Sequence, residues 1–178
     1  MSTQLPIFTI GHSSRPLADF LDLLEQSCIE CVIDVRRLPG SNRFPQYNAD
    51  ALSASLAEVG MAYQQLPALC GRRTKRDLQG AALETFWTNA SFAIYAAYAR
   101  SEAFTLGLDA LLQRARRQRC TLMCSEAVWW RCHRRIITDH LLARGEAVCH
   151  IMGPGKVMPA TLTRGALIQD GAVIYPPP

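Results

Sequence analysis

Short segments of strand-like composition alternate with longer segments in which apolar residues recur at helical spacing. The first kind predicts β-strands, at residues 7–10, 31–36, 61–66, 120–124 and 147–151. The second kind predicts α-helices, at residues 16–24, 49–59, 92–99, 104–112 and 132–144. Because strands and helices alternate from end to end, we expect an α/β fold: a mostly parallel sheet with right-handed crossovers and helices on both faces, a Rossmann-like three-layer sandwich.

Two parts of the chain fall outside this alternation. Residues 67–89 have no clear period and contain four cations within residues 70–77, so we expect a long surface loop there. From about residue 153 we expect an extended C-terminal tail, in which Asp170 and Gly171 favour the turn of a small hairpin. No internal repeat is present, and the length suits a single domain over residues 1–178.

Composition narrows the class of protein. Hydrophobic residues make up 49% and charged residues 19% of the chain, which is typical of a compact globular protein. No apolar run approaches the roughly 20 residues that cross a bilayer, and the N-terminus lacks the features of a secretory signal. Seven cysteines, an odd number, favour reduced thiols in the cytoplasm over a disulfide framework. The net charge of +4 permits a phosphate-bearing partner without requiring one.

Nucleophiles, acids, bases and cations crowd into residues 124–134, between the fourth predicted strand and the last predicted helix. The candidate catalytic residues in this segment are Cys124, Glu126, Cys132 and His133. Arg134 is the candidate for binding an anion. In open α/β sheets, ligands bind at the carboxyl ends of strands. We expect Cys132, His133 and Arg134 to form the first turn of the helix. Its free N–H groups and positive dipole end then face whatever binds in that crevice.

Two earlier predicted strands also end in polar residues. His12 and Ser13 follow the first strand, and Asp34 and Arg36 lie at the end of the second. Parallel strands present the loops that follow them at the same edge, so we expect these residues to converge with the 124–134 segment. We assign His12 a catalytic role and the other three a role in ligand binding. Arg43, in the turn-rich stretch behind the second strand, joins the ligand-binding group.

Three blocks of this sequence together resemble a known family. They are residues 9–13, residues 32–36 with Pro39 and Ser41 behind them, and Cys124-x-Glu126-x5-Cys132-His133-Arg134. In this order they are similar to an uncharacterised bacterial and archaeal family, the domain of unknown function numbered four hundred and eighty-eight, over residues 9–151. The resemblance implies an α/β domain with the matched polar residues as its site, and no agreed reaction. The family favours glycine where this chain has Cys70, so Cys70 is not assigned a function.

Several candidates have a structural interpretation beside the functional one. Cys124 and Cys132 are either thiolates, because a helix dipole and nearby arginines lower a thiol pKa, or buried apolar cysteines. Glu126 is either a proton carrier or a cap that accepts helix N–H groups. Asp34 and Arg36 are either ligand contacts or a structural ion pair.

We predict no metal site. Candidate zinc ligands are present in Cys124, Cys132, His133 and His12, but Cys-x7-Cys-His is not a familiar zinc spacing. Cys28 and Cys31 have knuckle spacing without a second knuckle, so core packing explains them better. The sequence identifies no cofactor.

The favoured hypothesis is a cytoplasmic enzyme that binds a phosphate-containing ligand, a nucleotide or nucleic acid, at the strand ends. No membrane partner is expected. Arg36, Arg43 and Arg134 would hold the charge of the ligand. Cys124 or Cys132 would be the nucleophile or redox centre, and Glu126 would transfer protons.

Two alternatives stay open. One is a non-catalytic nucleic-acid-binding module, in which Trp129 and Trp130 stack on bases beside a group of arginines. The other, a minor one, is rhodanese-like or cysteine-phosphatase-like thiol chemistry. Those sites use Cys-x5-Arg, whereas six residues separate Cys124 from Arg131.

Overall fold

The computed structural model describes residues 4–178; residues 1–3, part of the segment in which no secretory signal was expected, lie outside the described residues. The described residues form a six-stranded sheet in the order β3-β2-β4-β1-β5-β6. Its strands are β1 (Ile7–Gly11), β2 (Cys31–Asp34), β3 (Ala62–Gln65), β4 (Cys120–Cys124), β5 (Val148–Gly153) and β6 (Lys156–Pro159). Strands β1 to β5 pair in parallel, and β6 pairs antiparallel with β5. The inner strands are buried on both faces, which explains their continuous apolar sequence.

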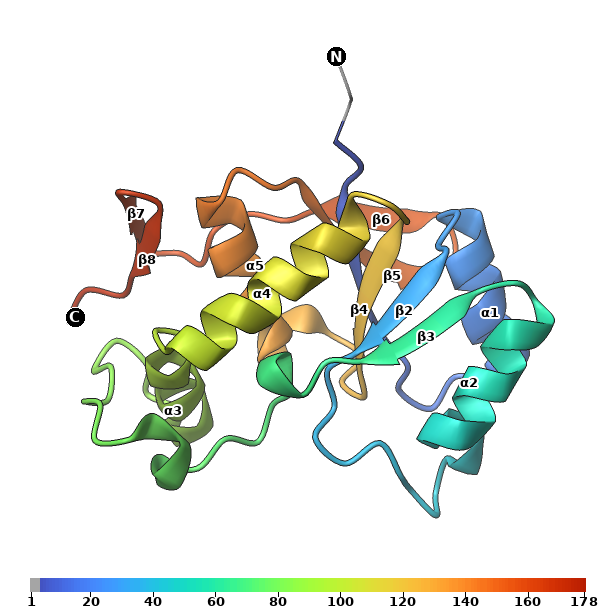
Figure 1. Ribbon diagram of the computed structural model, residues 1–178, viewed down its shortest axis with the longest axis horizontal. Coiled ribbons are helices and arrows are strands. Elements are labelled where there is room, and N and C mark those ends of the chain that lie inside the picture. The colour runs from blue at the N-terminus through green and yellow to red at the C-terminus, as the bar shows by residue number, and fades with distance from the viewer. Residues whose placement is uncertain (1–3) are drawn as a thin grey trace.

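Helices cover both faces of the sheet (Figure 1). On one face lie α1 (Leu17–Gln26) and α2 (Ala49–Glu58), and on the other lie α3 (Ala90–Tyr98), α4 (Glu102–Ala115) and α5 (Arg134–Ala143). Each face has its own apolar core, one packed under α1 and α2 and the other under the remaining three helices. The predicted α/β three-layer fold is therefore confirmed.

The strand order brings three loops to one edge of the sheet. β4 lies between β2 and β1, with Gly11 beside Cys124 and Asp34 beside Met123 in the register. The residues that follow β1, β2 and β4 therefore emerge next to one another, although more than a hundred residues separate the first from the last. The segment after β2 runs below this edge in Figure 1.

The parts outside the main alternation are more ordered than the sequence indicated. Residues 67–89 contain two 3-10 turns, η2 (Pro67–Leu69) and η3 (Lys75–Leu78), and bury Trp87, so they are not a surface loop throughout. The region expected to be an extended tail supplies β6 and a hairpin of β7 (Leu167–Gln169) and β8 (Ala172–Ile174). The hairpin turn at Asp170 and Gly171 is as predicted, and both residues have positive φ. β6 was not predicted because its residues are all exposed and carry no strand pattern.

No helix within residues 4–178 has the length and apolar character needed to span a bilayer.

Candidate functional site

Two cysteines lie side by side where β4 ends. Cys124 is the last residue of β4, and the 3-10 turn η4 (Trp129–Arg131) folds the following loop back, so that Cys132 returns to it. Their Sγ atoms are 3.1 Å apart, and both residues are buried. The expectation that Cys132 and His133 lie in the first turn of the helix is wrong. Cys132 has an extended backbone, His133 is the N-cap, and Arg134 is the first helical residue.

Cys132 was expected to lie at the positive dipole end of the helix. In the structure, the positive charge beside Cys132 is the side chain of Arg134. Arg134 is 1% exposed; its Nε donates to Cys132 Sγ over 3.1 Å, and its Nη2 donates to the Glu126 carbonyl over 2.5 Å. Its Nη1 donates to the Thr9 hydroxyl over 3.4 Å, and that hydroxyl lies 2.7 Å from His150 Nδ1. Hydrogen bonds in three directions therefore hold the guanidinium plane against the thiol.

The two thiols differ in protonation. Burial raises the pKa of Cys132, but the hydrogen bond from the Cys124 thiol and the charge of Arg134 outweigh burial and lower this pKa to about 6. Burial and the neighbouring Cys132 raise the pKa of Cys124 well above its usual value. The pKa of Cys132 therefore lies below that of Cys124, so Cys132 is the more acidic thiol of the pair.

A buried ion pair lies at the neighbouring strand end. Asp34, the last residue of β2, accepts hydrogen bonds from Nε and Nη2 of Arg36 at 2.9 and 2.7 Å, and from its backbone N–H at 3.0 Å. Tyr63 on β3 donates to the same carboxylate over 2.5 Å. The carboxylate fixes the direction of the guanidinium, whose Nη1 lies 3.2 Å from His12 Nε2.

His12 is a neutral acceptor in this arrangement. Burial is the main cause that lowers its pKa to about 4, and the charge of Arg36 contributes. Nδ1 of the ring donates to the Ser13 carbonyl over 2.8 Å, which leaves Nε2 to accept from Arg36. The ring also stacks on Tyr47, with centroids 4.2 Å apart. Both nitrogens are therefore occupied, and His12 orients Arg36.

His133 joins the 124–134 segment to the end of β2. Its Nε2 donates to the Val35 carbonyl over 2.9 Å, so Nδ1 carries the lone pair. Burial lowers its pKa to about 4. A Cβ atom at Gly71 would lie 2.6 Å from Nδ1, so the chain after β3 approaches the ring at a residue without a side chain.

These groups surround a cavity of about 600 Å³ at the carboxyl edge of the sheet. The residues predicted from the sequence that line it are His12, Arg36, Cys124, Glu126, Cys132 and His133. The other lining residues come mainly from the segments after β2 and β3 and from α3: Arg37, Leu38, Gly40, Ser41, Phe44, Gly71, Arg72, Arg73, Ser91, Phe92, Tyr95, Ser125 and Arg131. Five arginines and one glutamate line the cavity. Asp34 pairs with Arg36, and Asp77 pairs with Arg37 and Arg73, so the charge of the lining stays positive but is partly offset.

Four residues predicted to bind a ligand do not line the cavity. Asp34 and Arg134 are buried, and each holds a cavity residue in place. Ser13 uses its carbonyl to orient the histidine before it. Arg43 is exposed, and its guanidinium lies over the ring of Phe44, 5.2 Å from the centroid.

Glu126 is exposed at the cavity. In the part of the chain that the structure describes, its carboxylate has neither an ion-pair partner nor a hydrogen bond, whereas its backbone carbonyl accepts from Arg134. The capping interpretation does not apply, because the N-terminus of α5 has no side-chain cap. The carboxylate is therefore available to a ligand.

Sequence reasoning missed most of the cations that line the cavity. Arg72 and Arg73 lie in the segment read as a surface loop, and Arg37 was given no role. The concentration of cations in residues 70–77 was the signal, but no pattern connected that segment to the cysteines. Arg73 is fixed by the Cys70 carbonyl, 3.0 Å from its Nε, and by the ring of Tyr98, 4.0 Å from its guanidinium.

Gly11 lies where β1 passes the 124–134 segment. A Cβ atom at Gly11 would lie 1.7 Å from the Glu126 carbonyl oxygen, the acceptor of Arg134. We expect Gly11→Ala to push this segment away and to lower the free energy of unfolding by about 1–3 kcal/mol, the usual cost of overpacking. Urea unfolding measures the change. Gly153→Ala is the matched control, because nothing lies within 4 Å of its Cβ position; equal losses in both variants would contradict the steric argument.

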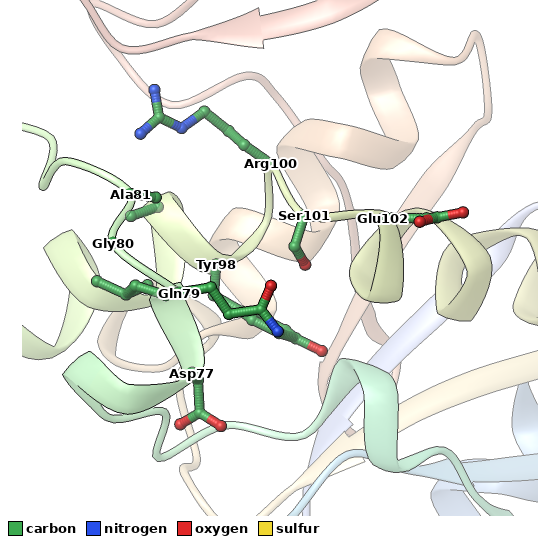
Figure 2. Close-up of a pocket in the computed structure, with 10 residues that line it drawn as sticks. Asp77, Gln79, Gly80, Ala81, Tyr98, Arg100, Ser101 and Glu102 are labelled. Atoms are coloured by element: carbon green, nitrogen blue, oxygen red, sulfur yellow. The ribbon is translucent and has the colours of Figure 1, made fainter.

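A second cavity, also of about 600 Å³, lies between η3 and the junction of α3 and α4 (Figure 2). It contains none of the residues predicted to be functional. In Figure 2 the charged ends of Asp77, Arg100 and Glu102 point in different directions and do not converge on a common point. Asp77 is also committed to the backbone and hydroxyl of Thr74. The cavity at the cysteines is therefore the better candidate site.

Within residues 4–178, no group of three or more histidine, cysteine, aspartate or glutamate side chains has an arrangement that can hold a metal ion.

One comparison with known proteins gives a match. The family model described as Domain of unknown function DUF488 matches residues 16–141. The match includes the second and third blocks of the resemblance, whereas the first block, residues 9–13, precedes it. Comparisons with curated proteins and with solved structures find no match.

Proposed function

We propose that this chain, which belongs to the family described as Domain of unknown function DUF488, is a thiolate enzyme that acts on a small molecule carrying phosphate. One observation carries the proposal. Cys132 Sγ accepts a hydrogen bond from Arg134 Nε at 3.1 Å and lies in the wall of an arginine-lined cavity. A thiolate is the nucleophilic form of cysteine, and a cationic cavity beside it favours an anionic substrate.

The arginines around the cavity supply the binding charge. Arg37, Arg72 and Arg131 are exposed there, and Arg73 is half-buried. Guanidinium groups match phosphate oxygens with paired hydrogen bonds, so these side chains suit a phosphate-bearing substrate. Asp77 lies 3.6 Å from Arg37 and 3.9 Å from Arg73 and offsets part of their charge. The charge of Arg36 is offset more closely, by buried Asp34 at 2.7 Å. We assign Arg36 to orientation of the ligand.

The proposed reaction begins with attack by the Cys132 thiolate on an electrophilic atom of the bound substrate. The bond from sulfur to that atom forms, the bond from that atom to the leaving group breaks, and the leaving group departs with the bonding electrons. Arg134 and Cys124 stabilise the thiolate before the attack. Glu126 in its carboxylic acid form protonates the leaving group, and the resulting carboxylate then deprotonates a water molecule whose oxygen displaces Cys132 and releases the product. All seven cysteines are free thiols, and we propose a cytoplasmic location because this chemistry needs reduced thiols.

The two alternatives receive less support. Trp129 stacks on the ring of His150, with centroids 4.5 Å apart, so only Trp130, which is 43% exposed, is available to stack on a base. A rhodanese-like or cysteine-phosphatase-like site needs a Cys-x5-Arg loop. The thiolate here is Cys132, and the arginine that contacts it is Arg134, two residues further along.

Alkylation of Cys132 as a function of pH tests the proposal. A pKa of about 6 predicts a half-maximal rate of reaction with iodoacetamide near pH 6, because the thiolate forms as the pH rises through the pKa. A free thiol such as glutathione has its midpoint at about 8.5. The rate at Cys132 is followed by mass spectrometry of its peptide, and its pH midpoint is independent of steric access to the cavity.

Charge and ligand binding are tested in the same assay. The ratio of the iodoacetate rate to the iodoacetamide rate is expected to be higher at Cys132 than at glutathione, because the cavity attracts the anionic reagent. Inorganic pyrophosphate is expected to protect Cys132. A midpoint at or above that of glutathione contradicts the thiolate, and an absence of protection contradicts the phosphate-bearing substrate.

A further inference from the structure

The cavity contains a second sulfur that the proposed attack uses only as a hydrogen-bond donor. Cys124 Sγ lies 3.1 Å from Cys132 Sγ, and a disulfide bond is about 2 Å long, so the two sulfur atoms need to approach by only about 1 Å to bond. The loop that η4 folds back creates this proximity across eight positions of sequence. Both residues line the same cavity, so a substrate atom bonded to one sulfur is within reach of the other.

The two sulfurs have the distinct roles that thiol–disulfide exchange requires. Exchange needs one thiolate to attack and a second thiol to displace the first product. Arg134 Nε donates to Cys132, which makes Cys132 the attacking sulfur. Cys124 keeps its proton while the pair is reduced, and its Sγ, 3.1 Å from Cys132 Sγ, is within reach of the bond that it has to form.

Access limits the size of the disulfide. Cys124 and Cys132 are 3% and 8% exposed, at a cavity of about 600 Å³. A disulfide fixed in the surface of another folded protein cannot reach sulfurs buried to this degree, whereas a small molecule can enter the cavity. The arginines that line the entrance favour a small molecule with acidic groups.

We infer that the Cys132 and Cys124 pair reduces a small disulfide whose halves carry acidic groups, an inference that rests on the thiolate function proposed above. The Cys132 thiolate attacks one sulfur of the disulfide; a Cys132–sulfur bond forms, the substrate S–S bond breaks, and one half leaves as a thiolate. Cys124 then attacks Cys132 Sγ; the Cys124–Cys132 bond forms, the mixed disulfide breaks, and the second half leaves. The Cys124 proton passes to a departing thiolate. The substrate gains two electrons, and the cysteine pair loses two.

The experiment mixes the reduced full-length chain with oxidised glutathione, a small disulfide with carboxylates on both halves. The expected result is release of two molecules of reduced glutathione per chain, with no glutathione left on the protein and a Cys124–Cys132 disulfide in the peptide map. Cystamine, a small disulfide with amines on both halves, is expected to react at least about tenfold more slowly, because the arginines repel it.

Variants separate the two steps. Cys124→Ser is expected to stop at the mixed disulfide, with one glutathione released and one bound to Cys132. Cys132→Ser is expected to release none. Cys120→Ser is the matched control: Cys120 lies opposite Cys31 on neighbouring strands, is buried and is remote from the cavity, and this variant should behave as the unchanged chain.

The outcomes distinguish this inference from the function on which it rests. If Cys132 is alkylated with a midpoint near pH 6 but oxidised glutathione leaves the pair reduced, or stays bound to Cys132 of the unchanged chain, the redox inference is wrong and the thiolate function stands. If cystamine reacts as fast as oxidised glutathione, the acidic substrate class is wrong. If the alkylation midpoint is that of an ordinary thiol, both proposals fail.

Discussion

Asp34→Ala is expected to lower the free energy of unfolding by about 3–5 kcal/mol, the cost of leaving one partner of a buried ion pair without the other. The Arg36 side chain is 9% exposed and Asp34 is fully buried. Without the carboxylate, the guanidinium loses both side-chain hydrogen bonds to it, and Tyr63 loses the acceptor of its hydroxyl. Equilibrium unfolding in urea, with the slope checked for two-state behaviour, measures the loss.

Two milder variants show whether burial is the cause. Tyr63→Phe removes one hydrogen bond to the same carboxylate and is expected to cost about 1 kcal/mol. Asp109→Ala breaks the ion pair with Arg144 at the surface, where both side chains are partly exposed to solvent, and is expected to cost less than about 1 kcal/mol. If Asp34→Ala costs no more than Asp109→Ala, then Arg36 finds other partners or water, and the ion pair does not fix the cavity wall.

A folded Asp34→Ala chain also reports on the cavity. In this variant the carboxylate no longer fixes the direction of the Arg36 guanidinium. Its Nη1 is then no longer held near His12 Nε2. We therefore expect pyrophosphate to protect Cys132 less well, while the pH midpoint of alkylation stays near 6, because Asp34 does not contact the thiolate.

The convergence of His12, Arg36 and Cys124 could be predicted because it follows from a rule of parallel sheets. Each residue lies at or just after the carboxyl end of a strand, and these ends share one edge. The sequence did not indicate which strands are neighbours. The observed order puts β4 between β1 and β2, and the register of Gly11 with Cys124 then sets the loops in contact.

The details that give Cys132 its chemistry were not predictable from local pattern. A helix beginning at Cys132 fits the sequence as well as one beginning at Arg134, and only the turn η4 decides between them. The arginine that contacts the thiolate was predicted to bind a ligand, but its burial depends on Thr9 and on the Glu126 carbonyl, which lie in other parts of the chain. The predicted catalytic roles of Cys124, Cys132, Glu126, His133 and His12 all stay predictions.

The arginines after β3 show the same limit. Residues 70–77 have no periodicity that would place them, so their cations read as a hydrated loop. Their position at the cavity depends on the Gly71 N–H, which donates to the Val35 carbonyl over 3.2 Å, and on the close approach of Gly71 to His133. Contacts between segments so far apart in sequence leave no trace in local composition.

Arg134→Leu is expected to slow the alkylation of Cys132 at pH 7 by roughly thirtyfold or more. With a pKa of about 6, most of Cys132 is thiolate at pH 7. Without the guanidinium, burial, which raises the pKa, is opposed only by the Cys124 hydrogen bond. A return to the ordinary thiol value of about 8.5 leaves only a few per cent as thiolate at pH 7. Iodoacetamide is the reagent, because its neutrality separates this effect from attraction of an anion.

Arg135→Leu is the matched control for Arg134→Leu. Arg135 is the next residue of the same helix, but its side chain donates to the Thr163 hydroxyl over 3.0 Å and lies over the ring of Trp87. In Arg135→Leu we expect the pH midpoint of Cys132 alkylation to stay near 6. Arg134→Lys keeps a charge without the three-way hydrogen bonding, and a midpoint between those of the other two variants is expected. Thermal unfolding shows which variants are folded. A Cys132 midpoint that stays near 6 in folded Arg134→Leu would assign the stabilisation of the Cys132 thiolate to the Cys124 hydrogen bond alone.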